Sequence, residues 1–279
     1  MTVAGNRPAG GIVFAALVIL VMAYSLGPYV WTLLTSLKTE RELYQFPVTY
    51  LPHAPTLVNY VHVFQGNPFG RFLLNSCIVS VTSTVLCLFL ATLASYAFAR
   101  LEFPGSRALL LGILIVAMVP LITVIVPLYV LVRGLGLLNT YAGLIGPYIT
   151  WSLPVAIFIL TAFFREIPRD LEDAAAIDGC SRVGTLWRII APLAAPGIVT
   201  AGIIVFVNAW NEFLAALTLT STTEMRTITV GIALFRGEFS FPWGVISAAV
   251  LLATIPIVTL ILGGQRLVIR GLTAGAVKG

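Results

Sequence analysis

The chain has 279 residues, of which 59% are hydrophobic and only 10% are charged, and its mean hydropathy is +1.01. A water-soluble domain has roughly half apolar and a quarter charged residues, so this composition excludes an ordinary soluble globule. The net charge of +5 does not indicate nucleic-acid binding, because no basic stripe with interleaved aromatic residues occurs.

Apolar segments of about 20 residues predict membrane-spanning helices. They are 11–37, 72–99, 108–132, 141–164, 195–219 and 243–265. The first is too long for the h-region of a signal peptide, so we expect it to be retained. The predicted fold is therefore all-α, a polytopic membrane protein with six transmembrane helices.

Basic residues favour an orientation with both termini in the cytoplasm. With the N-terminus inside, the cytoplasmic pieces hold Arg7, Arg100, Arg107, Arg165, Arg169, Arg182, Arg188, Arg266, Arg270 and Lys278. The external pieces hold fewer: Lys38, Arg41, Arg71, Arg133, Arg226 and Arg236. We expect a multi-pass protein of the cytoplasmic (inner) membrane, surrounded by lipid.

Two external loops, 38–71 and 220–242, lie where a delivered substrate would arrive. The first is rich in proline and predicts an irregular surface with short helices. Prolines also occur inside three of the spans, at Pro120, Pro127, Pro147, Pro154 and Pro256. They free backbone carbonyls that lipid cannot satisfy, which indicates either kinks in a packed bundle or helices that line a cavity.

The longest cytoplasmic piece, 165–194, predicts two short helices joined by a turn. The first helix begins near Pro168 and has acids in its first turns, where the helix dipole favours them. Its apolar face is expected to hold Leu171, Ala174 and Ala175. Asp178 and Gly179 predict the turn.

A second helix can begin after Ser181 as its N-cap. Its apolar stripe consists of Val183, Leu186, Trp187 and Ile190. The pair could rest on lipid headgroups. The alanine face favours a protein groove instead, because small side chains allow close approach.

This segment resembles the EAA loop of importer-type ABC permeases, which has a Glu-Ala-Ala triplet, a glycine shortly after it and a proline further on. Here Asp173-Ala174-Ala175 stands for the triplet, with Gly179 and Pro192 at the matching intervals. Asp173 replaces the Glu, although Glu172 precedes it, and Ala191 replaces a Leu before the proline. The resemblance implies that the segment contacts an ATPase subunit. The implied coupling residues are Glu172, Asp173, Ala174, Ala175, Asp178, Gly179 and Pro192.

Two further stretches, 208–213 and the C-terminal 271–279, resemble the carbohydrate (MalG-like) branch of these permeases. The resemblance covers nearly the whole chain and implies a type I ABC importer permease fold. It implies an N-terminal helix and extracytoplasmic loop over 1–70, a permease domain over 71–266 and a cytoplasmic tail over 267–279. The implied cargo is a small carbohydrate, a disaccharide such as trehalose or maltose.

The resemblance also implies the partners: a second homologous permease subunit, two ATPase subunits and an extracytoplasmic sugar-binding protein. The chain has no Gly-x-x-x-x-Gly-Lys-Ser/Thr phosphate loop. We therefore expect a transport subunit without catalytic residues or a bound cofactor, with ATP and Mg²⁺ held by the partner ATPases. No nucleophile–base pair or Cys/His ligand spacing indicates an enzyme or a metal site.

Glu212 is the clearest ionisable residue within a predicted span. Placing it there costs about 2.5–3.5 kcal/mol, which makes it a candidate site residue. Asn208 and Asn211 offer amides nearby, and Trp210 and Trp151 could stack on a sugar ring. The alternative is that these residues only join helix to helix.

Other transport classes remain open. An ion-coupled secondary transporter would leave the 165–194 loop unexplained, and Glu212 alone is thin support for a cation site. Glycerol phosphate would favour an Arg cluster in the cavity, and no Arg lies in the middle of a span.

Overall fold

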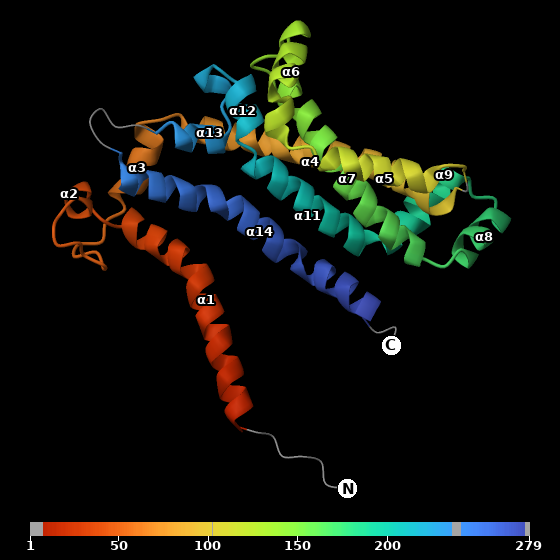
Figure 1. Ribbon diagram of the computed structural model, residues 1–279, viewed down its shortest axis with the longest axis horizontal. Helices are drawn as coiled ribbons and strands as arrows, with labels where there is room; N and C mark the ends of the chain where they lie inside the picture. Colours follow the sequence, from red (N-terminus) through yellow and green to blue (C-terminus); the bar gives the residue numbers. More distant parts are fainter. Residues whose placement is uncertain (1–7, 102, 236–240, 277–279) are drawn as a thin grey trace. The chain divides into compact units, whose positions relative to one another are not determined.

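The computed structural model of the chain describes residues 8–101, 103–235 and 241–276. Within these ranges every regular element is helical and no strand occurs (Figure 1). The predicted all-α fold is confirmed.

In the described ranges, four helices are long and apolar enough to cross a membrane. They are α1 (Pro8–Ser36), α4 (Phe69–Arg100), α7 (Tyr141–Glu166) and α14 (Trp243–Ala276). Two bent pairs add up to two more spans: α5 (Ser106–Ala117) with α6 (Leu121–Gly134), bent by 90°, and Arg182–Leu193 with α11 (Ala195–Asn211), bent by 81°. The six predicted spans are therefore obtained when each bent pair counts as one.

The third predicted span, 108–132, is wrong as a single helix. The chain breaks between α5 and α6 at Pro120, whose backbone is extended (φ −62°, ψ 135°). Proline has no N–H to donate and cannot continue the helical ladder. Pro147, Pro154 and Pro256 lie inside helices that do not end there, so sequence alone did not distinguish the proline that breaks a span.

The fifth predicted span, 195–219, is also divided. α11 ends at Asn211, and the short helix α12 (Leu214–Leu219) follows after a break at Glu212.

The chain forms two compact units. One contains α1, α2 (Glu40–Leu43), α3 (Val58–Gln65) and the beginning of α14. The other contains α4 through α13 (Ile228–Ala233) and the rest of α14. In Figure 1 these helices follow the colour order from red to blue.

In the first unit, the proline-rich loop has the predicted short helices α2 and α3 and an ordered polar interior. The Asn59 amide donates to the carbonyls of Ser36 (2.8 Å) and Lys38 (2.7 Å). The Glu42 carboxylate accepts from the His53 backbone N–H at 2.9 Å and from the Thr49 hydroxyl at 3.0 Å. These donors, the His53 amide first, lower the pKa of Glu42.

In the second unit, α4 packs along α7 and α11 (Figure 1). Small side chains such as Ala91, Ala156 and Ala201 are buried between them. The Ser95 hydroxyl donates to the Ile157 carbonyl at 3.0 Å. Small residues let helix backbones approach closely, which is how helices associate where lipid supplies no hydrophobic driving force.

Candidate functional site

The 165–194 loop folds as two short helical segments joined by a turn, as predicted. α8 (Asp170–Ile177) is followed by α9 (Arg182–Thr185), a π-helical turn over Leu186–Ile190, and α10 (Ala191–Leu193). Gly179 has a positive φ of 80°, a conformation that favours glycine, and so permits the turn. The Ser181 hydroxyl accepts the Gly184 N–H at 3.2 Å, as expected of an N-cap.

α8 begins two residues after Pro168, and Pro192 lies in α10, just before the bend into α11. In the second segment, Leu186 and Ile190 of the predicted apolar stripe are buried. Val183 is exposed, and Trp187 is partly exposed and stacks on Phe89 at 5.8 Å. The predicted apolar stripe is therefore only half buried within this chain.

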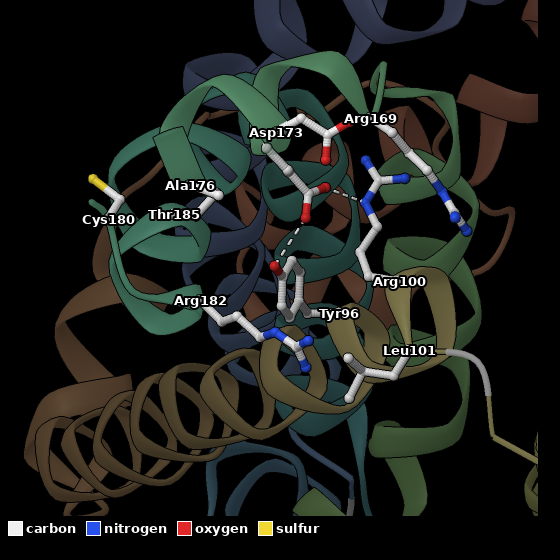
Figure 2. A pocket seen from close by; sticks show the side chains of 10 residues that line it. Tyr96, Arg100, Leu101, Arg169, Asp173, Ala176, Cys180, Arg182 and Thr185 are labelled. Carbon is white, nitrogen blue, oxygen red and sulfur yellow. Dashed lines mark hydrogen bonds and ion pairs between the residues drawn. The ribbon is translucent and has the colours of Figure 1, made fainter. Parts of the chain in front are cut away.

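Glu172 holds α8 to the ends of two long helices. Its carboxylate forms an ion pair with Arg100, the last residue of α4, and accepts from the Tyr96 hydroxyl at 2.9 Å (Figure 2). Arg100 also donates to the carbonyl of Ile167, next to the end of α7, at 2.8 Å. The Arg100 and Glu172 side chains are only 7% and 16% exposed, so this is a largely buried linkage.

Asp173, by contrast, is exposed. Ala174 and Ile177 are exposed beside it, and Ile177 is 87% exposed. We call Asp173, Ala174 and Ile177 the exposed face of α8. Of the three residues of the predicted apolar face, Ala175 is buried, whereas Leu171 and Ala174 are exposed.

A charged cavity of about 290 Å³ lies beside α8 (Figure 2). Tyr96 and Arg100 from α4 line it together with Asp173 and Ala176 from α8. Arg182, at the start of α9, completes the polar wall. This cavity borders the exposed face of α8, so both acidic and basic side chains are available to a partner.

Glu212 occupies the break between α11 and α12. Its backbone is extended (φ −65°, ψ 131°). Its carboxylate accepts the N–H groups of Ala215 (2.8 Å) and Ala216 (3.0 Å) and the hydroxyl of Tyr148 (2.8 Å). These bonds satisfy donors at the beginning of α12 that would otherwise have no partner. The acid in front of a short apolar run was a capping signal that the sequence analysis did not use.

A cavity of about 140 Å³ adjoins Glu212. Trp151 from α7 and Asn208 from α11 line it together with Glu212, so three of the predicted residues meet here. Tyr148 and Ser152 also line it and were not predicted.

The other two predicted residues do not line this cavity. Trp210 is 2% exposed and stacks on Phe206 at 5.5 Å. Asn211 is exposed.

Comparison with known proteins places this geometry in context. Residues 88–274 match the family described as binding-protein-dependent transport system inner membrane component. The chain is 51% identical to the sulfoquinovosyl glycerol transport system permease protein SmoH of Agrobacterium fabrum, over 93% of this chain and 91% of that protein. It is 45% identical to the trehalose transport system permease protein SugB of Mycobacterium tuberculosis, over 95% of this chain and 97% of that protein.

Among solved structures, the chain resembles that of a bacterial ABC transporter involved in the import of the acidic polysaccharide alginate. The TM-score is 0.80 at 22% sequence identity, with 95% of this chain and 99% of that chain covered. This likeness confirms the predicted fold.

Proposed function

The chain belongs to the family of binding-protein-dependent transport system inner membrane components, and from that premise we propose that it is a permease subunit of an ATP-driven importer for a small carbohydrate. The predicted resemblance to importer-type ABC permeases is thereby confirmed. As in the sequence analysis, we place both termini in the cytoplasm. We take 71–266 as the permease domain, 1–70 as the N-terminal helix and external loop, and 267–279 as the tail. Of that tail, α14 extends to Ala276, and 277–279 lie outside the described residues.

The observation that carries the proposal is that the two sides of α8 have different surroundings. One side is tied to α4 and α7 through Glu172 and Arg100. The other side leaves Asp173, Ala174 and Ile177 exposed. A partner that holds the exposed face would move the ends of α4 and α7 with it. Closure of two ATPase subunits on ATP would therefore rock the spans between outward and inward openings.

The coupling role has a direct test. Asp173→Arg reverses the charge on the exposed face without touching the Glu172–Arg100 pair. Losing a charge-assisted contact of about 1.5–3 kcal/mol should weaken ATPase binding about 10- to 100-fold and lower ATP-driven uptake correspondingly. Glu166→Arg, an exposed site before α8, is the matched control and should transport normally. Normal uptake by Asp173→Arg would refute the assignment.

For the cargo, we propose a neutral disaccharide such as trehalose or maltose. The described residues that line the Glu212 cavity include no Arg or Lys, so no cation is available there for a phosphate or a sulfonate. Trp151 offers an aromatic face and Asn208 an amide, a combination that suits a sugar ring. The Glu212 carboxylate already has three donors, and we assign it to shaping this wall.

The cavity is smaller than the roughly 300–1,000 Å³ of ordinary ligand sites. We therefore propose that a second, homologous permease subunit completes the pathway. The remaining partners are two ATPase subunits, which hold ATP and Mg²⁺, and an extracytoplasmic sugar-binding protein that approaches loops 38–71 and 220–242. In the second loop, 236–240 lie outside the described residues.

The function is tested by uptake of labelled trehalose, maltose and sulfoquinovosyl glycerol into proteoliposomes that hold the whole assembly. Uptake of a disaccharide that requires both ATP and the binding protein is the expected result. Uptake of sulfoquinovosyl glycerol alone, the cargo named for the 51% identical relative, would overturn the neutral-sugar assignment. Uptake driven by an ion gradient without ATP would overturn the importer class.

Trp151→Ala and Asn208→Ala should raise the KM for the transported sugar, because both residues line the cavity. Asn211→Ala, on the same helix as Asn208 but outside the cavity, serves as the matched control. An equal rise in KM for all three substitutions would refute the proposal that the residues lining this cavity contact the sugar.

A further inference from the structure

A second charged cavity, of about 490 Å³, lies where the ends of α4 and α7 meet the beginning of α5. Four arginines line it: Arg100, Arg107, Arg165 and Arg169. They come from two segments of the chain, 100–107 and 165–169, which the fold brings to one opening. None of the described residues that line this cavity is acidic.

Two of these arginines, Arg107 and Arg165, could pair with a bound anion. Arg100 is neutralised by Glu172. Arg107 and Arg165 are exposed, and neither has a carboxylate partner among the described residues. The Arg165 guanidinium donates to the Phe98 carbonyl at 3.4 Å, which directs it across the end of α4. A bound anion would therefore meet two guanidinium groups without breaking an existing ion pair.

The first turn of α5 also favours an anion at this position. Ser106 and Arg107 belong to that turn and line the cavity. The turn has no acidic residue, and its N-cap, Gly105, provides no side-chain acceptor. The N-terminus of a helix carries a partial positive charge. A cation such as Arg107 is therefore repelled there, and an anion beside it would remove this repulsion.

Two aromatic side chains also belong to the lining of this cavity. Phe98 and Phe103 line the cavity, and their rings lie 5.8 Å apart. The opening lies at the ends of α4 and α7, which are apolar enough to span a membrane, and of α5, which is one half of a bent span. A ligand here would have a negatively charged head against the arginines and apolar chains against phenylalanine and lipid.

We propose that this cavity binds the headgroup phosphate of an anionic phospholipid. The inference rests on the proposed orientation, which puts this end of the spans at the cytoplasmic face. Arginine forks match phosphate oxygens in geometry and charge, and basic pockets between helices on that face suit anionic headgroups. Because Arg100 borders both this cavity and α8, the lipid would also support the place where α8 is anchored.

The test is lipid retention by the purified full chain, measured by native mass spectrometry during titration with phosphatidylglycerol or phosphatidylcholine. The wild-type chain should retain phosphatidylglycerol selectively. Arg107→Gln with Arg165→Gln should weaken its binding about 30-fold, from the effect of two basic residues near a membrane surface. Arg133→Gln with Arg188→Gln removes the same charge from two exposed sites outside the cavity and should leave binding within about twofold.

Several results would overturn the proposal. Equal retention of phosphatidylcholine, or equal weakening in the control pair, would show that the cavity is not selective. Displacement of the lipid by millimolar inorganic phosphate would make it a site for a soluble anion. Unchanged lipid retention with loss of ATPase co-purification in Arg107→Gln with Arg165→Gln would make it a protein contact.

If that double variant does not fold, Arg107→Lys with Arg165→Lys keeps the charge but loses the fork. This variant should retain selectivity for phosphatidylglycerol with weaker binding, and full loss of selectivity overturns the charge argument. Lipid retention is measured without transport, so failure of the lipid proposal and failure of the importer proposal give different results.

Discussion

Replacing Glu172 by alanine should loosen α8 far more than replacing its neighbour Asp173. The substitution leaves the Arg100 guanidinium, 7% exposed, without its carboxylate. It also removes the acceptor of the Tyr96 hydroxyl. Breaking a buried ion pair by deleting one partner costs about 3–5 kcal/mol. Glu172 itself is 16% exposed, so we expect the lower end, about 3 kcal/mol.

The assay is hydrogen exchange of the amides of α8 in the full chain, because exchange reports local opening. A change of about 3 kcal/mol corresponds to opening about 100-fold more often. Tyr96→Phe deletes one hydrogen bond to a charged group and should give about a tenfold change. Asp173→Ala is the matched control, and as an exposed surface change it should stay within about twofold.

The reasoning is refuted if Glu172→Ala and Asp173→Ala accelerate exchange equally, or if the second exceeds the first. A double variant of Glu172 and Arg100 sharpens the test. The free-energy effects of substituting two residues of one ion pair are not additive. The double variant should therefore destabilise α8 by less than the sum of the two single variants. Strict additivity would show that the pair does not act as a unit.

Three further substitutions test other parts of the fold. A methyl group at Gly231 would lie 2.2 Å from the Phe72 ring, whereas nothing lies within 4 Å of one at Gly146. In thermal unfolding of the detergent-solubilised chain, Gly231→Ala should therefore lower stability by about 1–3 kcal/mol, and Gly146→Ala should not. The lowered pKa of Glu42 gives stability that is present above the ordinary value of 4.5 and lost as the pH falls below it, so proteolysis of the 39–53 loop should increase below pH 4.5, and Glu42→Gln should remove this dependence. Tyr148→Phe deletes one of three donors to Glu212 and should cost about 1.5 kcal/mol in the same unfolding assay; no change would show that the Tyr148 bond does not help to hold the break between α11 and α12.

Local features of the sequence were sufficient to predict much of this molecule. Long apolar runs identify helices because each backbone group in lipid must find its partner inside the helix. The turn at Gly179 and the cap at Ser181 depend on a few neighbouring residues, so they too could be predicted. The spacing from Asp173 to Pro192 indicated the family, which the match over 88–274 confirms.

Tertiary structure alone decided what these residues face. Tyr96 and Glu172 are 76 positions apart, and their contact explains why Glu172 is held inside while Asp173 is exposed. In the same way, the sequence suggested Trp210 as a sugar contact, but packing against Phe206 buries it. Composition and periodicity specify that a helix forms. The direction in which each side chain points depends on helices that are distant in sequence, because burial and hydrogen bonding are settled only when the helices pack together.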